Sequence, residues 1–220
     1  MKRSVLFLLI AIVALATVSC GTGCCPSQNK AWKAVIKQYS PVDSCSALVL
    51  VKYIDGCDAT VEYFVRDKKG RLTFDSANDG FVGKNGIGKE KEGDMRTPIG
   101  EFQLTKAFGI LENPGTEMEY IDVKPTTWAC SCPEYYNLII DSEQKGHVCE
   151  DGEEMYSYVP AYNYGMVLSY NPQRIVGLGC NIFFHCKGKN PYTAGCVAVD
   201  EEFIKHVLQT CGTKPVISIH

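Results

Sequence analysis

The sequence lacks a surplus of charge of either sign, and it contains no basic stripe. Its 220 residues include 22 lysines and arginines and 25 aspartates and glutamates, which gives a formal net charge of −3. Without the two cations next to the first residue, Lys2 and Arg3, that charge becomes −5. Nucleic-acid binding depends on clustered positive charge, so this balance argues against a nucleic-acid partner. Internal repeats and low-complexity segments are also lacking.

Long apolar runs are scarce as well. The run Val5–Val13 follows Lys2 and Arg3 and precedes small residues. This is the layout of a secretory signal, and the run is too short for a comfortable membrane span. The alternative is an uncleaved N-terminal anchor. We therefore predict a leader over residues 1–20 and an extracytoplasmic protein, secreted or membrane-anchored at the cell envelope.

Two cleavage sites are compatible with this leader. Cleavage after Ala14-Leu15-Ala16 would release a soluble protein. Alternatively, Thr17-Val18-Ser19-Cys20 resembles a bacterial lipoprotein box, in which a lipidated Cys20 would tether the protein to a membrane.

Cysteine, in contrast, is abundant, with twelve in the chain. In an exported protein, cysteines favour disulfides. Setting aside Cys20 as a lipid site and Cys196 as a reactive thiol leaves ten, an even number that permits complete pairing with open connectivity. Because this even number requires Cys20 to be set aside, it favours the interpretation in which Cys20 is retained and lipidated. The ten are Cys24, Cys25, Cys45, Cys57, Cys130, Cys132, Cys149, Cys180, Cys186 and Cys211.

A zinc site is the alternative use of these cysteines. Cys130-x-Cys132, His147-x-Cys149, Cys180 and Cys186 could supply thiolate and imidazole ligands. No pair has the C-x2-C spacing of a strong zinc motif, and export favours disulfides. We therefore predict no metal and no cofactor.

The pattern of the rest of the chain predicts a mainly β domain. Residues 21–44 read as a linker followed by a short helix, and the main domain covers residues 45–220. A second helix is expected after Asp200, with Phe203, Ile204, Val207 and Leu208 on one face. Residues 77–94 read as loop, and residues 113–164 as a long disulfide-pinned insert that could cover a site. Strands are expected at 47–53, 60–66, 71–74, 99–104, 164–170, 182–184 and 216–219. Many strands with one or two short helices predict a sandwich or partly closed barrel.

The residues best suited to chemistry lie in Asn181–Val199. An apolar run ends at His185, and after a polar loop Thr193-Ala194-Gly195-Cys196 leads into the run Val197–Val199. Two strands joined by a loop can bring His185 and Cys196 within hydrogen-bonding reach, as thiol catalysis requires. Gly195 permits a tight turn, and the backbone N–H groups there can face a developing oxyanion.

These residues resemble the active-site signature of the L,D-transpeptidase (YkuD-type) catalytic domain family, whose members are secreted bacterial cysteine enzymes acting on peptidoglycan stem peptides. The segment Gly93–Phe102 is similar to the family's Thr-Pro-x-Gly-x-Phe segment, and the resemblance covers about residues 45–219. Ala194 stands where the commoner pattern has a histidine. Val197 stands where an asparagine or arginine often follows the cysteine.

The resemblance implies the family's fold and a cysteine acyltransferase. Cys196 would attack a stem-peptide amide, while His185 acts as general base and acid and, as imidazolium, stabilises the thiolate. The thioester would pass to an amine, as in an L,D-transpeptidase, or to water, as in an L,D-carboxypeptidase or endopeptidase. The alternative from another class is a non-catalytic, disulfide-rich cell-wall-binding domain with Cys196 oxidised.

Each site residue also has a structural alternative. Cys196 could be half of a disulfide, and His185 could be a core histidine with a backbone partner. Thr193 is a candidate substrate-binding residue or a turn residue that bonds its own backbone. Tyr192 and Trp128 could line a cleft or belong to the core. Two loop lysines, Lys187 and Lys189, could hold a substrate carboxylate or be solvated.

Overall fold

The computed structural model describes residues 30–41 and 43–220. The predicted leader over residues 1–20, with Cys20, and the linker cysteines Cys24 and Cys25 lie outside these ranges. Within them, no helix has the length and apolar character needed to cross a bilayer. A first helix, α1 (Lys30–Gln38), matches the short helix expected in residues 21–44.

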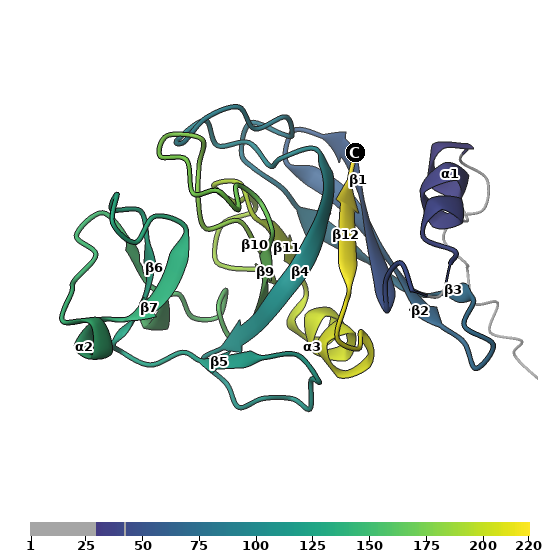
Figure 1. Ribbon diagram of the computed structural model, residues 1–220. Coiled ribbons are helices and arrows are strands. Elements are labelled where there is room, and N and C mark those ends of the chain that lie inside the picture. Colours follow the sequence, from purple (N-terminus) through teal and green to yellow (C-terminus); the bar gives the residue numbers. More distant parts are fainter. Residues whose placement is uncertain (1–29, 42) are drawn as a thin grey trace, which may run out of the picture.

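The fold is mainly β, as predicted, and its main sheet closes into a ring. The sheet has the order β12-β1-β2-β3-β11-β10-β9-β4-β5. One half of β4 pairs with β12 and the other half with β9, which closes the ring (Figure 1). The strands are β1 (Ala47–Asp55), β2 (Asp58–Arg66), β3 (Leu72–Phe81), β4 (Gly100–Gly109), β5 (Tyr120–Asp122), β9 (Gly165–Leu168), β10 (Phe183–Cys186), β11 (Val197–Val199) and β12 (Val216–Ile219).

A helix packs against this ring through the face that the sequence predicts. In α3 (Glu201–Thr210), Phe203, Ile204, Val207 and Leu208 are all buried. They join the main core with residues from β1, β2, β9 and β12. Asp200 is the N-cap residue, but its side chain makes no capping bond. Its carboxylate instead accepts a hydrogen bond from Asn78 Nδ2 and forms an ion pair with Lys187.

Strand β3 is longer than predicted. Residues 77–81 were expected to be loop, because Gly, Asn and Asp are poor strand formers. In the structure they continue β3, since Ala77 to Phe81 pair in register with Glu62 to Asp58 of β2. The ladder of hydrogen bonds with β2 overrides the local preference there, and Phe81 also pairs with Ala198 of β11.

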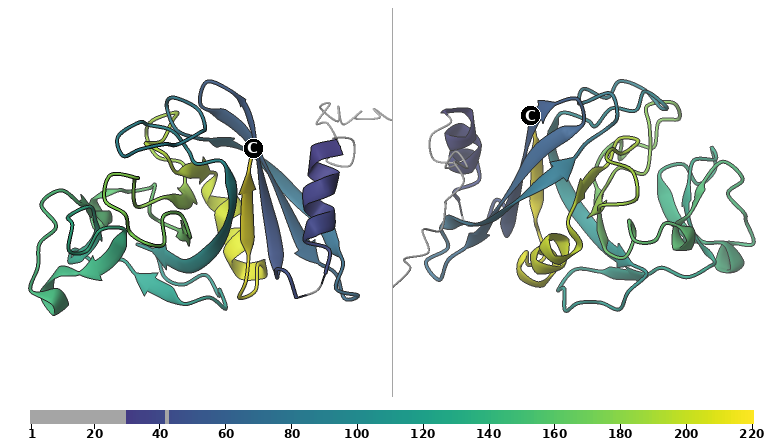
Figure 2. Two further views of the ribbon diagram at one scale, coloured as in Figure 1. Left: turned by 45° about the horizontal axis from the view of Figure 1, so that its top comes forward. Right: turned by 180° about the vertical axis from the view of Figure 1, so that it is seen from behind.

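The insert forms a small sheet of its own. β7 (Leu138–Asp141), β6 (Thr127–Cys130) and β8 (Glu153–Glu154) pair in that order, next to α2 (Ser142–Lys145) and a 3-10 turn, η2 (Met155–Ser157). A Cys130–Cys149 disulfide pins it. All views place this sheet and α1 at opposite ends of the molecule (Figures 1 and 2).

Extensive disulfide pairing was the wrong prediction. Among the described residues, Cys130–Cys149 is the one disulfide, and Cys45, Cys57, Cys132, Cys180, Cys186, Cys196 and Cys211 are free. Several of them act as small core residues: Cys186 and Cys211 lie in the main core and donate S–H bonds to backbone carbonyls. The parity argument for a lipidated Cys20 therefore loses its basis.

Candidate active site

The parallel pairing of β10 with β11 brings His185 and Cys196 to one face of the sheet. Phe184 lies opposite Val197 and His185 opposite Ala198. Cys196 directly precedes β11, so it falls level with Phe183. Side chains alternate between faces along a strand, and Cys196 therefore shares a face with Phe183 and His185.

Both side chains line one cavity of about 450 Å³. Cys196 is a free thiol with 8% of its surface exposed, and His185 is 7% exposed. The cavity lies within the size range typical of small-ligand sites. The insert contributes much of its wall, as predicted, through Glu153, Tyr158 and Tyr162.

The turn that presents Cys196 is held by two threonine hydroxyls. Thr193 Oγ1 donates to the Cys196 carbonyl at 2.7 Å and accepts the Gly195 N–H at 3.1 Å. Thr97 Oγ1 donates to the same carbonyl at 3.1 Å. Gly195 has φ of +150°, and a Cβ there would lie 2.9 Å from the Arg96 carbonyl oxygen, so the turn requires glycine.

This bonding bears on two of the predicted roles. The Gly195 N–H, expected to face an oxyanion, is already bonded to Thr193. The Thr193 hydroxyl is bonded within the turn, and the residue also lines the cavity, so its predicted role in substrate binding stays a prediction. Because the Gly195 N–H is bonded to Thr193, the neighbouring Cys196 N–H is the other backbone donor of this turn that could face the oxyanion.

The imidazole of His185 is oriented by the backbone. Its Nδ1 lies 2.7 Å from the Cys186 carbonyl oxygen. A carbonyl can only accept, so Nδ1 carries the proton and the neutral ring keeps its lone pair on Nε2. Burial lowers the pKa of His185 to about 4, although the Cys186 and Ala161 carbonyls favour the charged form. The ring is thus neutral at pH 7.

The thiol of Cys196 is neutral in this state too. Burial, together with the nearby Glu153 carboxylate, raises its pKa to about 12. The Phe183 N–H, which donates to the sulfur at 3.3 Å, and the Lys89 ammonium both lower it. The expected thiolate–imidazolium pair is therefore absent from the described site, where burial favours two uncharged groups.

Glu153 is a cavity residue that sequence patterns could not identify. It lies on β8 in the insert, where hydrophobic periodicity is weak, and its partner is the Tyr162 hydroxyl, which donates to Oε2 at 2.5 Å. Burial raises the pKa of Glu153, and the Tyr162 hydrogen bond opposes that rise. Tyr162 in turn packs edge-on against the ring of His185, with 5.4 Å between centroids.

A buried ion pair behind the Cys196 turn was also missed. Lys89 Nζ lies 2.9 Å from Asp94 Oδ1, with side chains 4% and 10% exposed. Asp94 also accepts backbone N–H bonds from Glu90, Lys91 and Arg96. Burial raises the pKa of Asp94, but the Lys89 ammonium and these N–H groups more than offset it, so the pKa falls well below its usual range.

The other candidate residues divide between the cavity and structural contacts. Tyr192 and Lys189 line the cavity, whereas Lys187 pairs with Asp200 at 2.8 Å and packs over Phe81. Trp128 packs in the small core of the insert instead.

Comparison with known proteins gives few matches. No family model matches the chain, and no curated protein matches it. Among solved structures, it is similar to the crystal structure of the helical cell shape determining protein Pgp2 from Campylobacter jejuni, with 16% identity and a TM-score of 0.42. The match covers 81% of this chain and 48% of that one, so the chain spans about half of that protein's length.

Proposed function

We propose that this protein is an extracytoplasmic cysteine acyltransferase that forms a thioester with a peptidoglycan stem peptide and passes the acyl group to an amine, as in the L,D-transpeptidase family that its sequence resembles. The observation that carries the proposal is a free Cys196 thiol and a His185 imidazole lining one cavity from adjacent strands. The choice of stem peptides as substrate rests on the sequence resemblance.

The neutral state of both groups favours a mechanism in which proton transfer and attack are coupled. The Cys196 thiol donates to the Asn181 carbonyl at 3.4 Å, so the S–H must first turn toward His185. His185 Nε2 then takes the proton as the sulfur attacks the amide carbon, and an isolated thiolate never accumulates in the buried site. The Cys186 carbonyl holds the Nδ1–H throughout and stabilises the imidazolium as it forms. His185 then gives the proton to the departing amine, which leaves the thioester on Cys196.

The negative charge of the tetrahedral intermediate needs a donor close to the sulfur. The Cys196 N–H fills this role, because the Gly195 N–H is held by Thr193. Tyr192 and Lys189 lie on the cavity wall, where they can contact the rest of the substrate.

The thioester can go to an amine or to water, and one experiment separates these outcomes. Purified protein is incubated with a stem tetrapeptide, with and without an acceptor amine, and the products are followed by mass spectrometry. We expect an acyl-enzyme at Cys196 and a crosslinked product only when the amine is present. A hydrolysed product in both arms would instead assign a carboxypeptidase.

Matched variants test the nucleophile. Cys196→Ala should abolish the acyl-enzyme, while Cys57→Ala, which changes another free thiol, should retain it. Acylation or crosslinking that survives in Cys196→Ala would refute the proposal. The binding-domain alternative requires an oxidised Cys196, and it would be favoured if peptide mapping found that residue resistant to alkylation in the unfolded, unreduced chain.

A further inference from the structure

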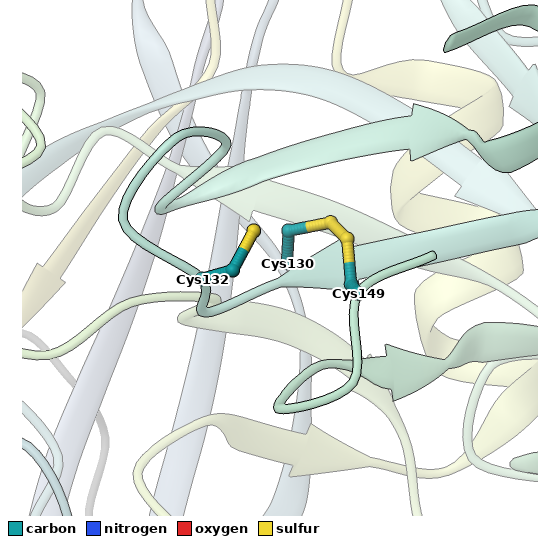
Figure 3. Close-up of side chains that lie close together, drawn as sticks. All are labelled: Cys130, Cys132 and Cys149. Carbon is teal, nitrogen blue, oxygen red and sulfur yellow. A yellow bond between two sulfur atoms is a disulfide. The ribbon is translucent and has the colours of Figure 1, made fainter. Parts of the chain in front are cut away.

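A second cluster of reactive side chains lies in the insert, outside the cavity lining. The three sulfur atoms of Cys130, Cys132 and Cys149 all lie within 4.8 Å of one another. Figure 3 shows the Cys132 sulfur, from the loop after β6, directed toward the Cys130–Cys149 pair. His147 lies beside this group: its Nε2 is 3.2 Å from Cys132 Sγ, but it is not within 4.8 Å of all three sulfur atoms and would have to move closer to complete a ligand set.

Although the cysteine spacing predicts no metal, we propose that, with Cys130 and Cys149 reduced, these four side chains bind a zinc ion. Three thiolates and one imidazole form one of the usual ligand sets of structural zinc sites. With Zn–S bonds of about 2.3 Å, a tetrahedral ion holds its sulfur ligands roughly 3.8 Å apart, which the observed grouping within 4.8 Å already approaches. The ligands come from two short segments, Cys130-x-Cys132 and His147-x-Cys149.

The surroundings of the cluster suit a metal ligand set. Cys130 and Cys149 are fully buried, and with Ile140 they form the small core of the insert. The ring of Tyr135 packs against His147 with 4.7 Å between centroids, which restrains the imidazole beside Cys132. A sheet with so small a core needs a crosslink or a metal to be stable.

A disulfide between Cys130 and Cys149 involves only two of these four side chains. The Cys130–Cys149 bond involves two of the three sulfur atoms. Cys132 and His147 contact each other beside it and take no part in that bond. Zinc binding uses all four: the ion displaces one proton from each of the three thiols, and the resulting site carries a net charge of −1. Six cysteines outside this cluster in the described part of the chain are free, so thiols are not generally paired in this fold.

The site would stabilise the wall of the candidate active site. The Cys130 carbonyl accepts a hydrogen bond from Asn181 Nδ2, and the Asn181 carbonyl accepts the Cys196 thiol at 3.4 Å. Cys149 also precedes β8, which carries Glu153 into the cavity. The metal-binding proposal itself does not depend on the proposed catalytic function.

The test measures metal binding by the whole protein. The chain is reduced with a water-soluble phosphine, which becomes the phosphine oxide as the disulfide gains two electrons and two protons, and is then loaded with Zn²⁺ or Co²⁺. We expect about one zinc ion per chain and, with Co²⁺, the visible bands of tetrahedral thiolate coordination. Circular dichroism establishes that each variant is folded.

The variants separate zinc from disulfide. Cys132→Ser and His147→Gln should each weaken zinc binding at least about 100-fold, since even outer-shell changes cost 10- to 100-fold. Cys57→Ser should bind zinc as the wild type does. The proposal is overturned if the reduced wild type binds no zinc, if Cys132→Ser and His147→Gln bind it equally well, or if the Cys130–Cys149 bond resists reduction in the folded chain. Should Cys132→Ser not fold, His147→Gln and the wild-type Co²⁺ spectrum decide.

Discussion

Two charged side chains act in opposite directions on the Cys196 sulfur. The Glu153 carboxylate raises the pKa of the thiol, and the Lys89 ammonium lowers it. The balance of these charges adds to the dominant effect of burial. A substitution that removes one of these charges should therefore change the pKa of the Cys196 thiol.

We predict that Glu153→Gln lowers the pKa of Cys196, because it removes the nearby negative charge while keeping the shape of the side chain. Each unit of change alters the thiolate fraction about tenfold. The rate of iodoacetamide labelling at Cys196, followed by peptide mass spectrometry at pH 7 to 9, should rise. Glu154→Gln, an exposed neighbour on β8, is the control and should leave the rate unchanged. Equal rates in Glu153→Gln and wild type would contradict the prediction.

Residue patterns predict that His185 and Cys196 lie close together, but they do not predict the surroundings of this pair. His185 and Cys196 could be found because each borders a run of apolar, strand-forming residues, and strand pairing brings such ends together. Glu153 and Lys89 reach the site from an insert and a loop, where spacing along the chain says nothing about proximity. The neutral state of the pair depends on burial, which only the tertiary structure fixes.

At the scale of elements, the Thr193 hydroxyl is one of two that hold the turn between β10 and β11. We predict that Thr193→Val destabilises the protein by about 1–3 kcal/mol, because the buried Gly195 N–H loses its acceptor. Thr193→Ser keeps the hydroxyl and should lose much less. Urea unfolding of both variants gives the two free energies, and a Val variant as stable as the Ser variant would show that the hydroxyl does not hold the turn.

The loop behind this turn depends on its buried ion pair. We predict that Asp94→Asn costs about 3–5 kcal/mol of unfolding free energy, because it leaves the Lys89 ammonium buried without a counter-charge. The matched control is Glu119→Gln, which breaks the exposed pair with Lys106 and should cost at most about 1 kcal/mol. Similar losses in the two variants, measured by urea unfolding, would be inconsistent with a structural role for the Lys89–Asp94 pair.

The elements themselves were largely predictable where apolar residues alternate. The face of α3 and the start of β1 follow directly from periodicity. The extension of β3 through Asn78 and Asp79 does not, because partner strands supply those hydrogen bonds. The small sheet of the insert has strands of two to four residues, too short to produce a recognisable pattern.

At the scale of the whole molecule, His185 links stability to pH. Its pKa is about 4 when folded, against 6.5 for the exposed ring. Between these values the unfolded chain binds more protons, so the stabilising contribution is complete above pH 6.5 and is lost as pH falls toward 4.

We therefore predict that, between pH 7 and pH 4.5, the wild type loses about 2–3 kcal/mol more unfolding free energy than His185→Gln, which cannot titrate there. Urea unfolding of both proteins at the two pH values measures this difference. Parallel losses in the two proteins would mean that His185 titrates normally in the folded state.

Among the predictions about the whole molecule, the fold class was correct and the cysteine pairing was not. A mainly β domain with few helices followed from the strand patterns, and the structure confirms it. Cysteine pairing did not follow from cysteine number, because Cys45, Cys186 and Cys211 are buried as free thiols in separate parts of the fold. Counting residues cannot distinguish a crosslink from a small core side chain.

The closure of the ring also constrains the order of events when the polypeptide emerges N-terminus first from a ribosome or translocon. β12 joins β1 to β4, yet it follows every other strand along the sequence. Until residues 216–219 emerge, β1 and the first half of β4 keep unpaired edges, which can pair with other chains. The ring therefore closes only after β12 has been synthesised. A chaperone that covers the edges of β1 and β4 until then would raise the yield of folded molecules.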